Sequence, residues 1–249
     1  VERAGRFADR LSVNVELPRE DTLIELAPEK RGDIIRKSMG QVRLGIDAGK
    51  ERNAPIFAPA GQSTQMIVGA DGANDRDILN SSRRLYSGYN LKRVYYSAFS
   101  PIPDSSSRLP LQAAPLMREH RLYQADWMMR FYGFESDEIV TRDDGLLDLA
   151  IDPKLAWALA NRDRFPVDVN TADRELLLRI PGLGVKTIDK LLRARRQRLL
   201  GLEDIARLTR SVEKCRPFII TRDWRPVVLA DAEIEARMRP VAQQLDLFT

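Results

Sequence analysis

The chain has very little of the residues that build disulfide frameworks and metal clusters. Its 249 residues include one cysteine, Cys215, and one histidine, His120. A single cysteine excludes a disulfide within the chain and a cysteine-based metal cluster built from this chain alone. The sequence also lacks an apolar run long enough to span a bilayer and lacks a visible signal peptide. We therefore expect a cytoplasmic protein that makes no contact with a membrane.

The excess of charge is small and unevenly distributed. The net charge is +4 at pH 7. Basic residues outnumber acidic ones in the segment from Arg174 to Arg216. A local basic patch on a nearly balanced chain indicates a docking surface for an anion rather than general adhesion to polyanions.

Strands and helices alternate over the first hundred residues. The patterns predict strands at Arg10–Leu17, Thr64–Ala70 and Leu91–Phe99 and helices at Arg31–Arg52 and Asp75–Tyr89. This alternation is typical of βα units with a parallel sheet, in a barrel or in an open sheet.

The rest of the chain is predicted to be mainly helical. We expect a long helix at Leu116–Phe134, a short helix at Pro153–Asn161 and a pair of helices that begins near Val167. From Arg222 onward the chain is polar and interrupted by prolines, which predicts an exposed tail.

Two amphipathic helices meet at a glycine-rich turn, Pro181–Gly184, inside the basic segment. We expect Asn170 and Thr171 to cap the first helix and the second helix to start after the turn. A Gly-x-Gly turn that opens a helix exposes backbone N–H groups at the positive end of the helix dipole, where a phosphate fits. The residues predicted to contact DNA are Pro181, Gly182, Leu183, Gly184, Val185, Lys186, Lys190 and Arg193.

The hairpin resembles the helix-hairpin-helix module, which grips a nucleic-acid backbone without reading bases. An ordinary pair of antiparallel helices with glycine at the turn is the alternative. A second helix pair is expected at Gly201–Ile220, but its turn contains no glycine. We therefore expect this second pair to complete the small core and not to bind phosphate.

Polar side chains alternate along the first predicted strand. Ser12, Asn14 and Glu16 point to one side of it, and polar residues near the carboxyl end of a parallel strand often line an active site. The second strand ends in IVGADG, where Gly69 allows a ligand to approach the backbone. The alternative is an edge strand with its polar side in water.

Five segments together resemble the C-terminal part of a DNA modification or repair radical SAM protein with a helix-hairpin-helix tail. They are SVNVELP, TQMIVGADG, VYYSAFSPIP, PLMREHRLYQADWMMRFYGF and NTADRELLLRIPGLGVK. The resemblance implies an α/β fold, with the later βα units of a radical SAM partial TIM barrel followed by a small all-α helix-hairpin-helix domain. It implies four parts: a half-barrel (1–110), a helical extension and linker (111–166), the DNA-binding domain (167–220) and a tail (221–249).

The resemblance also implies cofactors. The complete parent would use S-adenosylmethionine and a 4Fe-4S cluster. The strand with Ser12, Asn14 and Glu16 matches one that contacts the methionine or ribose part of S-adenosylmethionine, and Gly69 lies in a segment that matches one near the adenine.

One departure from the family is large. The CxxxCxxC loop that holds the family's cluster is missing, and Cys215 in the C-terminal region cannot replace it. We therefore expect an N-terminally truncated chain or a remnant of the fold, and we assign no catalytic residue. The leading hypothesis is a DNA repair or modification protein of the radical SAM type. The alternative is a non-enzymatic adaptor that tethers a DNA-repair partner to DNA and to the sliding clamp.

The chain ends in a short motif with two apolar anchors. It consists of Gln244, Leu245, Asp246, Leu247 and Phe248. The motif is similar to the one by which bacterial replication and repair proteins dock on the sliding clamp, which makes the clamp a predicted partner.

Overall fold

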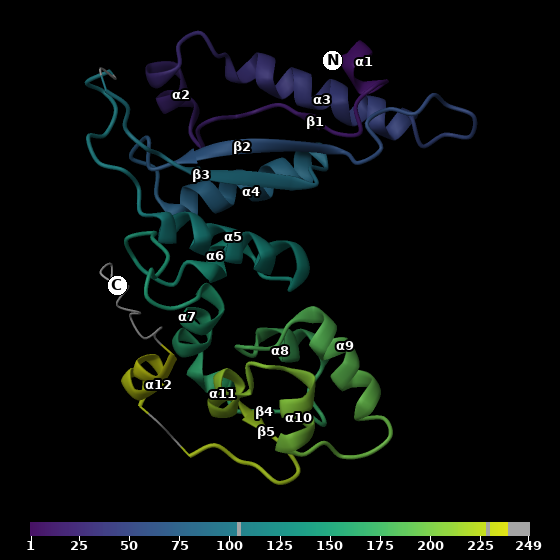
Figure 1. Ribbon diagram of the computed structural model, residues 1–249, viewed down its shortest axis with the longest axis vertical. Helices are drawn as coiled ribbons and strands as arrows, with labels where there is room; N and C mark the ends of the chain where they lie inside the picture. Colours follow the sequence, from purple (N-terminus) through teal and green to yellow (C-terminus); the bar gives the residue numbers. More distant parts are fainter. Residues whose placement is uncertain (104–105, 228–229, 239–249) are drawn as a thin grey trace, which may run out of the picture. The chain divides into compact units, whose positions relative to one another are not determined.

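The computed structural model describes residues 1–103, 106–227 and 230–238 (Figure 1). It is a mixed α/β structure with small parallel sheets, which confirms the predicted fold class at this coarse level. Two compact units are present: Val1–Asp126 with Arg142–Leu147, and Trp127–Thr141 with Asp148–Thr249. The division falls within helix α5 (Leu116–Phe131). None of the helices in the described ranges combines the length and apolar character that crossing a bilayer requires.

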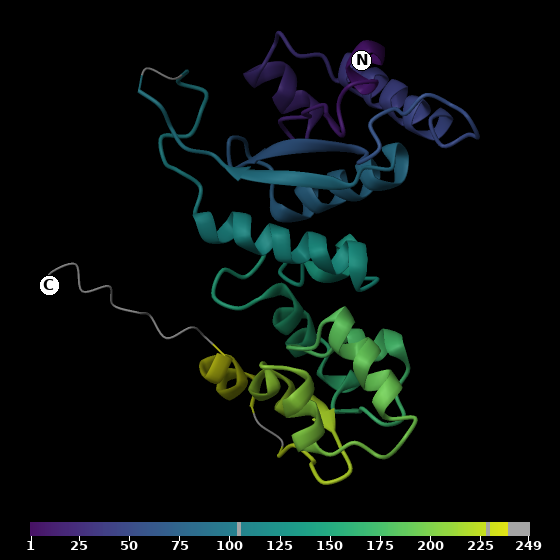
Figure 2. The ribbon, with the colours of Figure 1, turned by 45° about the vertical axis from the view of Figure 1, so that its right-hand side comes forward.

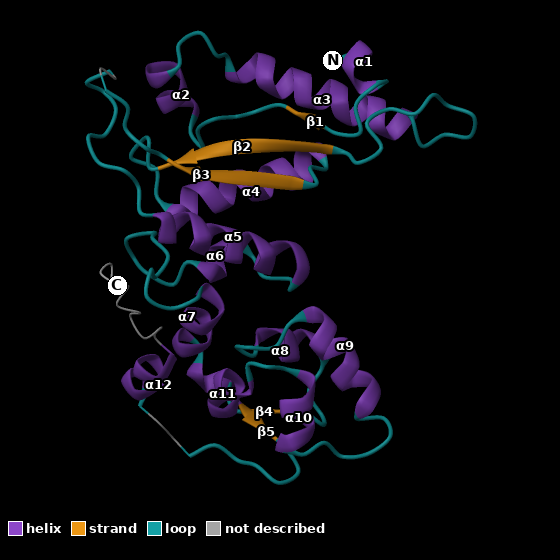
Figure 3. Ribbon diagram, in the orientation of Figure 1, coloured by secondary structure: helices purple, strands orange, loops and turns teal. Residues whose placement is uncertain are grey.

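The first unit contains a three-stranded parallel sheet in the order β1-β2-β3 (Figure 3). Its strands are β1 (Leu11–Ser12), β2 (Gln62–Val68) and β3 (Arg93–Ala98). Its helices before α5 are α1 (Glu2–Gly5), α2 (Glu20–Leu26), α3 (Gly32–Ala48) and α4 (Asp75–Tyr89). Helix α4 lies behind β2 and β3 in Figure 3 and has the predicted bounds, because Asn74 and Asp77 form a reciprocal capping box at its start.

The expected strand Arg10–Leu17 is wrong beyond Ser12. Only a single bridge, between Glu16 and Met66, follows β1. Glu16 has a φ of 64°, and the N–H of Leu17 donates to the carbonyl of Val15 at 2.8 Å. The chain therefore makes a tight turn at Glu16, and a regular alternation of side chains cannot continue through it.

Side chains of α5 form hydrogen bonds with the backbone along the outer edge of β3. The Tyr123 hydroxyl accepts from the N–H of Tyr96 and donates to its carbonyl, both at 3.0 Å. Glu119 accepts from the N–H of Ala98 at 2.8 Å. Helix α5 runs alongside β3 (Figure 2), and its polar atoms satisfy groups that a fourth strand would otherwise pair with.

The second unit is mainly helical. Its helices after α5 are α6 (Ser136–Ile139), α7 (Pro153–Ala160), α8 (Arg174–Arg179), α9 (Val185–Ala194), α10 (Leu202–Leu208), α11 (Val212–Cys215) and α12 (Asp231–Met238). Single 3₁₀ turns occur at Arg162–Arg164 and Arg216–Phe218. Phe165 packs edge-on against both Trp157 and Phe218 in the core of this unit.

Two expectations for this unit are wrong in detail. The region 167–220 is not all-α, because β4 (Val167–Asp168) pairs in parallel with β5 (Ile219–Ile220) and joins its two ends. The segment after Arg222 is not only an exposed tail, because it contains α12, in which Ile234 is fully buried.

Candidate nucleic-acid interface

The predicted glycine turn joins α8 to α9 (Figure 1). Helix α8 begins after Asp173, whose carboxylate accepts from the N–H of Leu176 at 2.7 Å. The expected caps Asn170 and Thr171 are wrong: the Asn170 amide instead bonds both ways with the backbone of Leu200. Asp173 caps the helix because it is the residue directly before α8, whereas Thr171 lies two residues further from the helix start.

The two glycines of the turn have different environments. Gly182 has a φ of +81°, and a Cβ there would lie 2.9 Å from both the Cys215 Sγ and the Ser211 carbonyl oxygen. Gly184 has an ordinary extended φ of −101°. A Cβ on Gly184 would meet the Tyr132 hydroxyl at 3.5 Å, which is a normal contact. The fold therefore requires glycine at 182, whereas a Cβ fits at 184.

The first backbone N–H groups of α9 have no partner. Those of Gly184, Val185, Lys186 and Thr187 find no acceptor among the residues that the structure describes. Unpaired N–H groups at a helix start carry a partial positive charge and point outward along the axis. This end of α9 is therefore suited to an anion.

Neighbouring helices of the same unit begin differently. Carboxylates cap α7 and α8, where Asp152 and Asp173 accept from the helix backbone. Helix α10 also begins after a glycine, Gly201, but Asp204 accepts from its N–H at 3.0 Å and Asp223 accepts from the next N–H at 2.7 Å. The protein's own carboxylates thus occupy the starts of these helices, whereas α9 has no such cap.

The second helix pair supports the first. The Thr209 hydroxyl donates to the Gly182 carbonyl at 3.2 Å, and Cys215 is fully buried against the turn. At the start of α10, Asp223 fills the space over Gly201, so the protein's own carboxylate occupies that helix start.

Basic side chains follow the start of α9 along one stripe. Lys186, Lys190 and Arg193 are exposed and are spaced four and three residues apart, so they share a helix face. Neither lysine makes an ion pair within the described ranges. Arg195 has a structural role instead, since its guanidinium donates to the carbonyls of Val169 and Ala172.

Two residues beneath the turn were not predicted. Lys154 is only 7% exposed, and its Nζ donates to the Leu183 carbonyl at 2.6 Å. The same Nζ lies 4.6 Å from the ring centroid of Tyr132. Burial lowers the pKa of Lys154 to about 7. The one sequence signal for this site is a lysine within the otherwise apolar helix PKLAWALA.

Three of the four predicted cofactor residues lie together in the first unit. Ser12, Asn14 and Glu16 line an open hollow of about 580 Å³, and the Ser12 hydroxyl donates to Asn14 at 3.0 Å. Glu16 is paired with Lys30. Gly69 does not line this hollow: a Cβ on it would lie 2.8 Å from the Cβ of Ala114, so a side chain already covers it.

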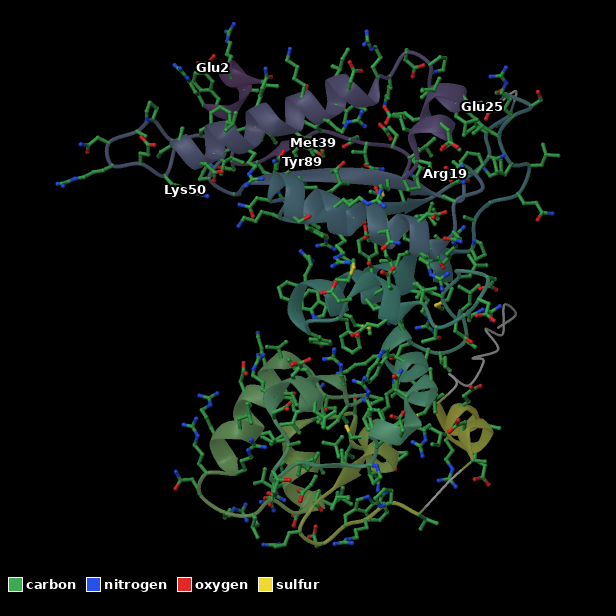
Figure 4. The ribbon with its side chains drawn as sticks, turned by 180° about the vertical axis from the view of Figure 1, so that it is seen from behind. Glu2, Arg19, Glu25, Met39, Lys50 and Tyr89 are labelled. Atoms are coloured by element: carbon green, nitrogen blue, oxygen red, sulfur yellow. The ribbon has the colours of Figure 1, made fainter. Side chains whose placement is uncertain are left out.

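A larger hollow of about 770 Å³ lies between α2, α3 and α4, with Arg19 and Tyr89 among its lining residues (Figure 4). Intramolecular ion pairs occupy two of its arginines, Arg19 with Asp21 and Arg36 with Glu20. This hollow includes none of the predicted cofactor residues.

The described residues do not fit the cofactors that the resemblance implies. Cys215 donates its thiol to the Ser211 carbonyl in the core, and burial raises its pKa to about 12. No group of three His, Cys, Asp or Glu side chains in the described ranges could hold a metal ion. The four residues predicted for S-adenosylmethionine do not form one site. We therefore derive no step through either group.

Comparison with protein-family models, with curated proteins and with solved structures gives no match to this chain. The predicted clamp-binding residues Gln244, Leu245, Asp246, Leu247 and Phe248 lie outside the described residues.

The two glycines provide a matched test of the turn. Gly182→Ala should lower the free energy of unfolding by ~2–3 kcal/mol, because the left-handed backbone and the clash with Cys215 both oppose a Cβ. Gly184→Ala should lower it by less than about 1 kcal/mol. Urea unfolding followed by tryptophan fluorescence measures both, since all three tryptophans lie in the second unit. Equal losses would show that the turn geometry is wrong.

Lys154 should make stability depend on pH. The unfolded side chain stays charged up to about pH 10.5, whereas burial lowers its folded pKa to about 7. Between pH 7 and pH 9 the unfolded chain therefore binds more protons, and the folded state gains stability as the pH rises. The gain should approach ~2 kcal/mol relative to Lys154→Met, as measured by urea unfolding. The window ends near pH 9, because above it the raised pKa of the Cys215 thiol acts in the opposite direction. If the free energy of unfolding changed with pH in the same way for wild type and for Lys154→Met, the low pKa of Lys154 would be contradicted.

Proposed function

We propose that this chain binds the phosphate backbone of DNA through the start of α9, with little preference for base sequence. The observation that carries the proposal is the group of unpaired N–H donors from Gly184 to Thr187, whereas carboxylates cap α8 and α10, the helices before and after α9 in the sequence. In this proposal a phosphate oxygen accepts hydrogen bonds from the N–H groups of α9, as aspartate carboxylates do at the capped helix starts.

The open space at Gly184 supports a close approach of the ligand. Nothing in the fold prevents a side chain at this position, and its backbone has the extended conformation typical of a helix N-cap. Glycine adds no side chain beside these N–H groups, so they stay accessible to a phosphate.

The basic stripe extends the contact along a strand. The stripe of Lys186, Lys190 and Arg193 covers eight residues of helix, and its ends are seven steps of 1.5 Å apart, or about 10 Å. One DNA strand carries a phosphate about every 3.4 Å along the duplex axis, so side chains spread over this length can reach more than one phosphate. Contacts of this kind position a protein on DNA and carry no base information.

The repair chemistry stays a prediction. The hairpin supports DNA binding equally in a radical SAM repair protein and in a non-enzymatic adaptor. The sliding clamp and a DNA-repair partner remain predicted partners of either.

Gly184→Asp should weaken DNA binding strongly without harming the fold. The carboxylate can accept from the N–H groups of α9, as Asp173 does for α8, so stability should be unchanged or higher by a few tenths of a kcal/mol. The same carboxylate occupies and repels the phosphate, so affinity for a fluorescent duplex should fall at least about tenfold. Anisotropy titrations at several salt concentrations measure the affinity.

Charge-matched variants complete the experiment. Lys186→Gln and Lys190→Gln, each made singly, should each reduce the slope of log affinity against log salt by about 0.9, because each removes one phosphate contact. Arg207→Gln removes the same charge from α10, where Arg207 pairs with Glu203, and should leave the slope unchanged. Unaltered DNA affinity of Gly184→Asp would refute the proposed function.

A further inference from the structure

Lys154 places a charge directly beneath the candidate phosphate site. Its Nζ is within 2.6 Å of the Leu183 carbonyl, and the residue lies on α7 among the buried side chains of Leu155 and Trp157. Removing an ammonium group from water is costly unless it has specific partners. The cost indicates that the hydrogen bond to the turn has a role.

The hydrogen bond from Lys154 to the Leu183 carbonyl determines where the N–H of Gly184 points. The carbonyl of Leu183 and the N–H of Gly184 belong to the same planar trans peptide group, so they point in opposite directions. Because Lys154 holds the carbonyl inward, the N–H is held outward, away from the core. A charged donor on the carbonyl also polarises the peptide and strengthens the N–H as a donor.

Tyr132, which follows α5, supports the same arrangement. Its ring faces the ammonium group at 4.6 Å, and its hydroxyl lies 3.5 Å from the position of a Cβ on Gly184. Lys154 and Tyr132 therefore both lie against the turn, and together they hold its geometry.

Several charged or titratable groups surround Lys154, but burial has the largest effect on its pKa. Asp152, at the start of α7, is engaged with Leu155 and with Lys214 at 3.5 Å. Arg179 on α8 disfavours a second positive charge, while Cys215 on α11 is a buried thiol. Burial is the largest cause of the low pKa of Lys154, about 7, so its charged form is incompletely populated at neutral pH.

We propose that Lys154 is a positioning residue of the phosphate site, whose ammonium form orients the N–H of Gly184 and adds positive charge behind it. This inference rests on the proposed function. Phosphate binding and protonation of Lys154 then favour each other, because linkage is reciprocal. Bound DNA should raise the pKa of Lys154, and DNA affinity should decrease as the pH rises through neutrality.

The first test measures DNA affinity against pH at constant ionic strength. Wild-type affinity should fall roughly fivefold or more between about pH 6 and about pH 8.5. Lys154→Met, which removes the charge and the donor, and Lys154→Gln, which keeps a neutral donor, should bind more weakly at low pH and show a flat profile. His120→Gln, which removes the one histidine of the chain, is one control. Lys214→Gln, which removes a neighbouring charge, is the other. Both controls should keep the wild-type profile.

The second test needs no DNA. In the free ¹⁵N-labelled protein, the Gly184 amide resonance should titrate with a midpoint near pH 7, and this titration should vanish in Lys154→Met. If wild type binds DNA and Gly184→Asp does not, yet the Lys154 variants keep the wild-type pH profile and the amide does not titrate, the role of Lys154 is refuted and DNA binding stands. If wild-type protein binds no DNA at all, both proposals fall.

Discussion

Every helix begins with backbone N–H groups that its own carbonyls cannot satisfy, and the second unit of this protein depends on how that constraint is met. At α7, α8 and α10 the chain supplies aspartate carboxylates, which neutralise the positive end of each helix. At α9 the N-cap residue is Gly184, which has no side chain to cap the helix. The stability forgone there is small, a few tenths of a kcal/mol relative to a good cap, and it leaves an electropositive surface available to an external anion.

An unfilled helix start binds well only if it is held rigidly. Gly182 has a left-handed φ, and Cys215 leaves no room for a Cβ there. Thr209, which follows α10, donates to the Gly182 carbonyl, and Lys154 on α7 donates to the Leu183 carbonyl. The geometry therefore exists before any ligand arrives, which reduces the entropy lost on binding.

Local patterns predicted much of this structure. The period of apolar residues placed α4, and the Pro-Gly-Leu-Gly turn placed the hairpin, because both depend on neighbouring residues alone. The turn at Glu16 was missed, since its backbone bonds to β2, about fifty residues away. Lys154 was missed for the same reason: its partner lies in the turn, and nothing in PKLAWALA identifies it.

Mapping the DNA contact by NMR tests the central claim most directly. When a short duplex is added to ¹⁵N-labelled protein, the amide resonances of Gly184, Val185, Lys186 and Thr187 should shift most, and those of Gly201 and Leu202 at the carboxylate-capped start of α10 should not. Higher salt should reverse the shifts, because phosphate contacts release counterions. Shifts at the start of α10 with none at α9, or no shifts in either helix, would contradict the account.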